Sequence, residues 1–187
     1  MNDKKVFPVP PLSWLQVAKS AETFMVSSFP SGISSPTSYP VAEILESGFI
    51  RNVFGFEYGI DQIQVEAITD FSSKTIILSE ETYLSLQEDD PRARFTVAHE
   101  FGHVALHSSY LFHMESSDRK AIKLCREEIP PYLNPESQAN TFAAALLMPN
   151  RHVRNLIFAG GSVQDIVTTF NVSWTAANKR YGNVNKF

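Results

Sequence analysis

The spacing of apolar and polar residues changes along the chain, and each change predicts a different kind of element. Residues 1–40 are rich in Pro and Ser, and prolines at this density interrupt both helices and central strands. We expect this segment to be extended or loop-like, with a short helix possible at 12–24. Between residues 59 and 79 the pattern is that of strands, and 75–78 is a run rich in β-branched residues.

Helical patterns dominate the second half of the chain. Asp90 is a good N-cap and Pro91 suits the first helical position, so we expect a helix over 92–107 that stops near 108–109. Asn134 and Pro135 start a second helix in the same way, and Pro149 ends it. Shorter helices are expected at 41–48, 150–158, 162–170 and 173–181.

Composition places the chain among ordinary globular proteins. Its 187 residues are 43% apolar, enough for a core that needs no disulfides. Cys125 is the only cysteine, which excludes an intramolecular disulfide and fits a reducing compartment. No signal peptide is visible, and no apolar run approaches the roughly 20 residues that a membrane span needs. We therefore expect a soluble, cytoplasmic protein with no membrane partner.

The candidate chemistry lies in the first of the two long helices. Its string TVAHEFGHVALH, from Thr96 to His107, contains the motif H-E-x-x-H. Side chains four residues apart share one helical face, so His99 and His103 can bind one tetrahedral zinc ion. Glu100 projects beside the metal, where it can take a proton from zinc-bound water. The flanking residues are apolar and Gly102 permits close approach of another backbone, which argues against a surface helix without a ligand.

A catalytic zinc site also needs a third protein ligand, and its fourth position is left to water. Glu136 stands in the first turn of the second long helix, whose small Ala139 and Ala143 would let that helix pack closely against Gly102. The helix dipole alone also favours an acidic residue at that position, so the residues leave the choice open. The candidates by spacing are Glu115, Glu127, Glu128, Glu136, His113 and Cys125.

His107 continues the histidine stripe one turn beyond His103. It lies roughly 6 Å further along the helix axis, too far to share the zinc ion comfortably. We expect it to contact a ligand side chain, the substrate or solvent. The longer metzincin motif would require His at 109, but this residue is Ser109, so that subclass is excluded.

Two blocks of sequence resemble the ImmA/IrrE metallopeptidase family. The first is RFTVAHEFGHVALH at residues 94–107, and the second is ESQANTFAAALLMP at 136–149. The resemblance covers about residues 41–182. It implies an α+β fold with a gluzincin-like core, in which a small sheet accompanies the H-E-x-x-H helix and a glutamate-bearing helix. The 75–78 strand is then a candidate edge for laying down a substrate peptide, although an ordinary core strand is the simpler interpretation.

The resemblance also implies roles for single residues. His99 and His103 become zinc ligands, Glu100 the catalytic base and Glu136 the third ligand, with one zinc ion per chain. Asn140 matches a position whose side chain can orient a ligand histidine. Many members carry a second acidic residue two places after the ligand glutamate. Here that residue is Gln138, which leaves Glu136 as the only acidic candidate in the block.

The C-terminal segment, residues 151–187, has five basic residues and one acidic, in a chain whose net charge is −4. Ser162 and Asp165 form a capping box, and Asn171 begins a turn, as in a helix-turn-helix. DNA contact would use Lys179 and Arg180 on phosphates. With few cations and no basic stripe, we favour a helical hairpin that packs on the catalytic part. Trp174 is expected in the core.

These observations divide the chain into three expected parts: a Pro/Ser-rich segment at 1–40, a metallopeptidase domain at 41–150 and a helical segment at 151–187. Members of the family cleave or antagonise transcriptional repressors, which implies a regulatory endopeptidase with a repressor as substrate. The alternative is a zinc-stabilised regulator that binds DNA or a repressor without cutting it. Hydrolysis of a small-molecule amide is a third possibility. An intact Glu100 favours an enzyme, because a zinc scaffold needs no base.

Overall fold

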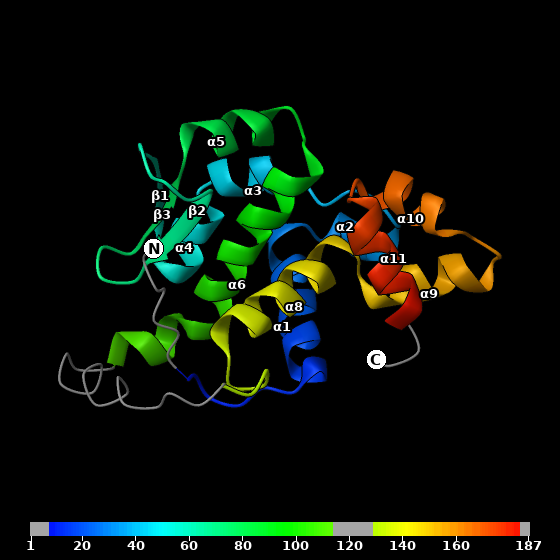
Figure 1. Ribbon diagram of the computed structural model, residues 1–187, viewed down its shortest axis with the longest axis horizontal. Coiled ribbons are helices and arrows are strands. Elements are labelled where there is room, and N and C mark those ends of the chain that lie inside the picture. Colours follow the sequence, from blue (N-terminus) through cyan, green and yellow to red (C-terminus); the bar gives the residue numbers. More distant parts are fainter. Residues whose placement is uncertain (1–7, 114–128, 184–187) are drawn as a thin grey trace.

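The computed structural model describes residues 8–113 and 129–183, and these form mostly helices with one small sheet (Figure 1). This confirms the α+β class. The strands are β1 (Glu57–Ile60), β2 (Ala67–Asp70) and β3 (Thr75–Leu78). The helices are α1 (Trp14–Ser28), α2 (Ser31–Ser34), α3 (Val41–Glu46), α4 (Phe49–Phe54), α5 (Glu80–Gln87), α6 (Pro91–His113), α8 (Pro135–Leu147), α9 (Asn150–Phe158), α10 (Val163–Phe170) and α11 (Trp174–Asn183).

The sheet has the order β1-β3-β2, with β1 parallel and β2 antiparallel to β3. The 75–78 strand is therefore central, and the idea that it is an edge for a substrate peptide was wrong. Its inward side chains Ile76 and Leu78 are completely buried, as expected of an ordinary core strand. The reason is topological: β2 and β3 pair as a hairpin, and β1 adds to the free side of β3. The edge strand that contacts α6 is β2.

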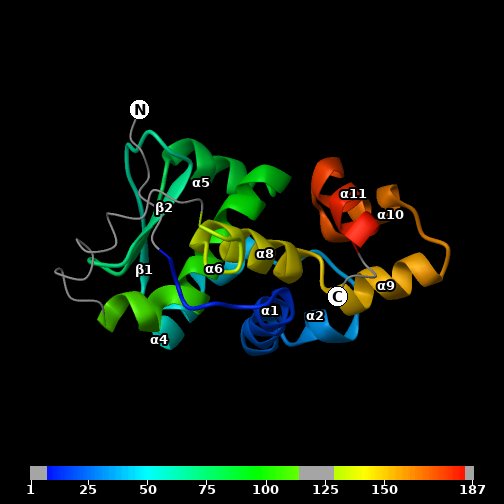
Figure 2. The ribbon, with the colours of Figure 1, turned by 60° about the horizontal axis from the view of Figure 1, so that its bottom comes forward.

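The N-terminal segment is less loop-like than its prolines suggested, and the helix considered possible at 12–24 is present as α1. α1 begins after Pro11, capped by Ser13 in a capping box with Gln16, and ends before Pro30, so the prolines flank the helix instead of interrupting it. Phe24 of α1 packs in the centre of the molecule. Its ring centroid lies 5.6 Å from that of Phe101 and 5.5 Å from that of Phe142. Figures 1 and 2 both place α1 beside α8. Part of residues 1–40 thus belongs to the same core as the H-E-x-x-H helix.

The two long helices start where their caps predict. Asp90 Oδ1 accepts hydrogen bonds from the amides of Arg92 and Ala93, and the Asn134 side chain caps α8. α6 runs on to His113, so the expected stop near 108–109 was wrong. Two serines are weak helix breakers, and helix propensity of this size is readily overridden by tertiary structure. The short helix α3 agrees with the expectation for residues 41–48.

The C-terminal helices α9, α10 and α11 lie on the opposite side of the molecule from the sheet (Figures 1 and 2). The capping box of Ser162 with Asp165 is present, and Asn171 ends α10 in the left-handed conformation. Apolar residues of this segment join the common core, so it packs as a hairpin. Trp174 is 56% exposed, which contradicts the expectation that it lies in the core. None of the described helices is long and apolar enough to cross a membrane.

Arg180 is not placed for the phosphate contact that the DNA-binding alternative would require. Its guanidinium is buried, and its Nε and Nη2 donate to the carbonyl oxygen of Met148 at 3.1 and 2.9 Å. Burial lowers the pKa of Arg180 to about 10. A side chain held in this way is not available to a DNA phosphate, whereas Lys179 beside it is exposed.

Candidate metal site

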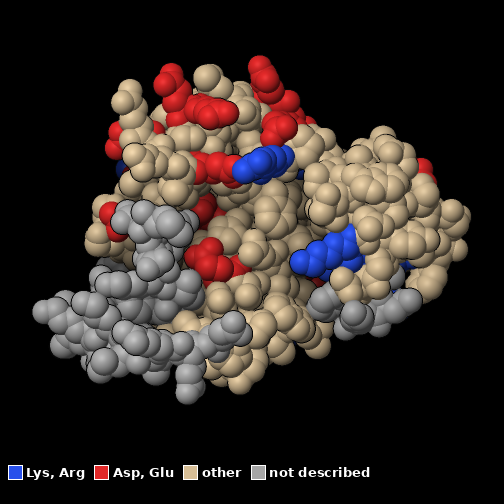
Figure 3. Space-filling view, viewed as in Figure 1, with Lys and Arg blue, Asp and Glu red and all other residues tan. Residues whose placement is uncertain are grey.

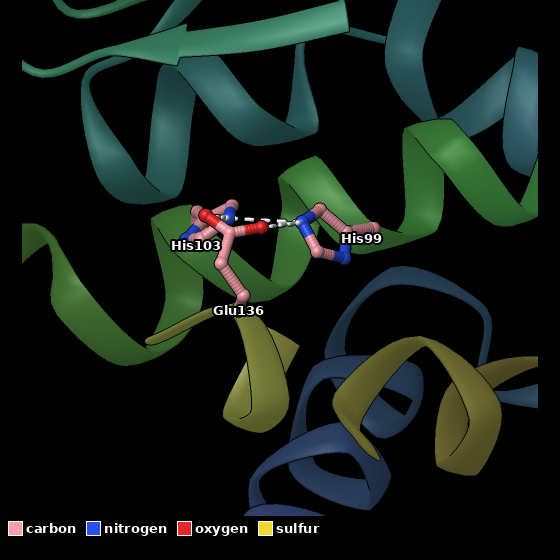
Figure 4. A group of neighbouring side chains, drawn as sticks. All are labelled: His99, His103 and Glu136. Atoms are coloured by element: carbon pink, nitrogen blue, oxygen red, sulfur yellow. Dashed lines mark hydrogen bonds and ion pairs between the residues drawn. The ribbon is translucent and has the colours of Figure 1, made fainter. Parts of the chain in front are cut away.

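Three side chains converge where α6 meets the start of α8 (Figure 4). His99 Nε2 lies 3.3 Å from one carboxylate oxygen of Glu136, and His103 Nε2 lies 3.5 Å from the other. The two imidazole nitrogens are 2.9 Å apart. All the ligand atoms lie within 4.8 Å of one another, and no other such group of His, Cys, Asp or Glu occurs among the described residues.

Of the six candidates for a third ligand, Glu136 is the one that the structure brings to the two histidines. Glu115, Cys125, Glu127 and Glu128 lie outside the described residues, as does the side chain of His113. The arrangement therefore agrees with Glu136 without testing the others.

Local sequence explains why these atoms meet. The i, i+4 spacing places both imidazoles on one face of α6. Asn134 caps α8 through the amides of Glu136 and Ser137, which fixes the first turn that carries the carboxylate. Gly102 lets the helices come close: a Cβ there would lie 3.1 Å from the Cα of Ala139. A side chain at position 102 would push α8, and with it Glu136, away from the histidines.

The electrostatics of the cluster call for a positive charge among the three groups. Hydrogen bonds with His103 and His99 hold the pKa of Glu136 well below its usual range. Burial by itself would lower the pKa of His99, but its bond with Glu136 and the charges of Glu100 and Glu136 raise it above the ordinary value. Two imidazoles and a carboxylate are a donor set that suits zinc. The side chain of Glu136 is 42% exposed, so the cluster is open to solvent on one side.

Each histidine has a polar partner behind it. His99 Nδ1 lies 3.0 Å from Oδ1 of Asn140, which agrees with the role that the family resemblance implied for Asn140. His103 Nδ1 lies 3.2 Å from Nδ1 of His107, and Nε2 of His107 lies 3.0 Å from Oε1 of Gln138. His107 is only 1% exposed, and burial lowers its pKa to about 4, so the ring is neutral at physiological pH. The expectation that His107 contacts a ligand side chain agrees with this geometry, and a surface role does not.

Glu100 is not part of the convergent group. Its side chain is buried, and one carboxylate oxygen accepts a hydrogen bond of 2.6 Å from the hydroxyl of Thr69 on β2. The carboxylate of Glu100 thus lies between α6 and the edge strand β2. The contact of Thr69 with Glu100 was not predicted, because nothing in the local sequence shows that β2 faces α6. The contacts of Gln138 were not predicted either, since this residue stood out only as a departure from an acidic one.

Comparison with known proteins supports the assignment of these residues to one family. A family model described as IrrE N-terminal-like domain, from a group of peptidases, matches residues 71–181, more than half of the chain. None of the curated proteins matches the sequence significantly.

Among solved structures, the chain is similar to a Mycobacterium tuberculosis transcriptional regulator, with a TM-score of 0.56 and 16% sequence identity. The similarity covers 88% of this chain and 54% of the regulator, so the chain spans about half the length of that protein. At this identity the likeness is one of fold.

Proposed function

The chain belongs to the IrrE N-terminal-like domain family of peptidases, and on this premise we propose that it is a zinc-dependent endopeptidase that cleaves a regulatory protein. The proposed ligands are His99, His103 and Glu136, with one zinc ion per chain, and Glu100 is the proposed catalytic base. The fold of this centre is then gluzincin-like, with an H-E-x-x-H helix and a glutamate-bearing helix near a small sheet.

The observation that carries the proposal is the convergence of acceptor atoms from α6 and α8. Two imidazole nitrogens 2.9 Å apart face a carboxylate at 3.3 and 3.5 Å. Lone pairs and a negative charge at such separations repel one another unless a proton or a metal ion lies between them. The donor set, two nitrogens and one carboxylate on an open side of the protein, supports zinc with room for a further ligand.

The chemistry of peptide hydrolysis divides between the metal and the chain. A bound zinc ion supplies Lewis-acid activation of water and of the scissile carbonyl group. Glu100 accepts the proton of the attacking water and later delivers it to the leaving amine. The hydroxyl of Thr69, which donates to Glu100, keeps the carboxylate at the position from which it can do so.

The substrate class is argued from the edge strand. Among the described residues, β2 pairs only with β3, and it carries the Thr69 that contacts Glu100. An extended peptide that adds to the outer edge of β2 would therefore pass close to the catalytic base. This arrangement favours a protein segment in extended conformation over a small-molecule amide.

A transcriptional repressor remains the proposed substrate. The supporting observations are the family and the structural similarity to a protein named as a transcriptional regulator. Within this proposal the enzyme works in the cytoplasm, because a transcriptional repressor acts there and a chain with a single cysteine suits a reducing compartment.

The alternative, a zinc-stabilised regulator that cuts nothing, would have to act by binding a repressor or DNA. DNA contact has little support in the C-terminal segment, because Arg180 is committed to Met148. On the face seen in Figure 3, acidic side chains gather over α5 and its ends, while Lys and Arg are sparse. A buried Glu100 held by Thr69 favours the enzymatic function, since a purely structural zinc site has no need of it.

The first test is the zinc content of the purified protein, measured by elemental mass spectrometry for the wild type and Glu100→Gln. We expect about one zinc ion per chain in both, because Glu100 is not a ligand. The second step incubates both proteins with a library of peptides of varied sequence. New cleavage products should appear with the wild type alone and should disappear with a chelator.

Two results would overturn the proposal. A wild type that binds no zinc after reconstitution has no metal centre. Repressor antagonism that survives Glu100→Gln in full, in a protein that still holds zinc, would establish the binding function instead.

A further inference from the structure

Three polar side chains form a hydrogen-bonded line that ends at the proposed ligand His103. In order they are Gln138, His107 and His103, and each pair lies at hydrogen-bond distance. We propose that Gln138 is a positioning residue, which acts through His107 to keep the proton of His103 on Nδ1 and so leaves Nε2 free to bind the metal. This inference rests on the proposed zinc site.

The orientation of the Gln138 amide is determined by its surroundings. Its Nε2 lies 3.0 Å from the carbonyl oxygen of Pro10 and 2.8 Å from that of Tyr132. A carbonyl oxygen can only accept, so the NH₂ group must face these two atoms. The side chain is fully buried, and the reversed amide would bring three oxygens together without a donor. Oε1 therefore faces His107.

The positions of the protons then follow one after another. Oε1 of Gln138 is an acceptor, so Nε2 of His107 carries a hydrogen and donates it. A neutral imidazole has one N–H and one lone pair, so Nδ1 of His107 is an acceptor. It lies 3.2 Å from Nδ1 of His103, which must donate. The lone pair of His103 is thereby placed on Nε2, the atom that faces Glu136.

The two carbonyl groups that start this sequence are themselves held in place. The amide of Val9 donates to the carbonyl of Leu133 at 2.9 Å, and that of Leu12 donates to the carbonyl of Tyr132 at 3.1 Å. The stretch at 9–12 thus lies along the stretch that leads into α8. In this way a segment distant in sequence from the H-E-x-x-H motif contributes to the state of a proposed metal ligand.

The two proposed histidine ligands differ in how firmly their hydrogen-bond partners are held. Asn140, behind His99, is exposed, so water can replace or turn its amide. Gln138, behind His107, is buried and has no such freedom. Partners of this kind typically change metal affinity by about 10–100-fold when they are removed. We expect the larger loss at Gln138.

The test compares two substitutions that remove hydrogen bonds of the line with one substitution that can preserve them. Gln138→Met and His107→Met have similar volumes to the native residues but lack the acceptor or donor atoms. His107→Gln restores both, because its amide oxygen can accept from His103 while its NH₂ donates to Gln138. Zinc dissociation constants are measured by competition with a chelator, and circular dichroism checks that each variant is folded.

We expect zinc binding to weaken about 10–100-fold in the two Met variants and to stay close to the wild type in His107→Gln. Equal losses in His107→Gln and His107→Met would overturn the inference, since packing alone would then explain them. Wild-type affinity in a folded Gln138→Met would overturn it as well.

A second readout uses no variant. The ¹⁵N–¹H spectrum of the wild type should show the proton of His107 on Nε2, in the metal-free and in the zinc-loaded protein. A proton on Nδ1 would overturn the inference. Because the spectrum of the metal-free protein tests the hydrogen-bond line by itself, a wild type that binds no zinc would defeat the proposed function without deciding this one.

Discussion

The contact between α6 and α8 and the contact of the C-terminal helices with the rest of the chain both bury polar side chains, and the two regions use them in opposite ways. At the first contact, the Nδ1 atoms of His99 and His103 face the polar partners Asn140 and His107, and possible ligand atoms of His99, His103 and Glu136 meet in the middle. At the second contact, guanidinium groups donate to carbonyl and carboxylate oxygens.

The second contact has two parts. Arg180 of α11 donates twice to the carbonyl of Met148. Arg94 of α6, only 2% exposed, forms an ion pair with Asp89 and donates to the carbonyl of Phe170 at 3.4 Å, and Asn171 donates to Asp89 from the other side. The comparison teaches that burial alone does not mark a ligand site. Convergent acceptors without protons call for a cation, whereas a guanidinium that covers carbonyl groups joins segments of the fold.

The largest effect that separates the two regions is expected for Glu136→Ala. Zinc binding should weaken by more than about 100-fold, since loss of a direct ligand should exceed the loss of a ligand's hydrogen-bond partner. The measurement is the zinc dissociation constant by chelator competition. Ser137→Ala, one residue away in the same helical turn, is the matched control and should keep wild-type affinity. Wild-type affinity in Glu136→Ala would mean that the third ligand lies elsewhere.

Arg180→Leu tests the other region. The carbonyl oxygen of Met148 would lose both donors, so the free energy of unfolding should fall by about 1–3 kcal/mol, measured by urea denaturation. Zinc affinity should be unchanged. The exposed neighbour supplies the control: Lys179→Ala should stay within about 0.5 kcal/mol of the wild type. If Arg180→Leu kept full stability and lost affinity for DNA, the phosphate-binding function would be right after all.

Thr69→Val should have the smallest effect. It removes the hydrogen bond to Glu100 while keeping the shape of the side chain, so kcat/KM should fall about 2–10-fold, as expected for one bond of about 0.5–1.5 kcal/mol. Zinc content should not change. Thr75→Val, in the same sheet but bonded to the carbonyl of Ser73, is the control. An equal loss of activity in both variants would point to a general weakening of the sheet.

What could be predicted from the sequence was local. The caps at Asp90 and Asn134 act over two or three residues, and the His99–His103 spacing acts over one helical turn, so each could be interpreted without knowledge of the fold. The family resemblance added Glu136 and the position of Asn140, which no local rule selects. The match of the family model to residues 71–181 confirmed the family itself.

What failed depended on contacts between distant segments. The central position of β3 follows from where β1 adds to the sheet, and the role of α1 follows from Phe24 reaching Phe101 and Phe142. Trp174 is exposed and Arg180 is buried, contrary to what their residue types suggest, because the fold turns the Trp to solvent and the Arg toward a carbonyl group. The role of Thr69 depends on the position of β2 beside α6, and that of Gln138 on the position of the 9–12 stretch beside α8.

The placement of the proposed ligands on two separate helices also bears on how much protein a cell can keep. Two of them belong to α6 and the third to α8, so the site exists only when these helices are docked. A metal that binds the docked state alone adds its binding free energy to the stability of the fold, about 2.7 kcal/mol at a free concentration of about 100 times the dissociation constant. A cell short of zinc would then lose the protein by degradation as well as its activity, and supply of the metal would set its abundance.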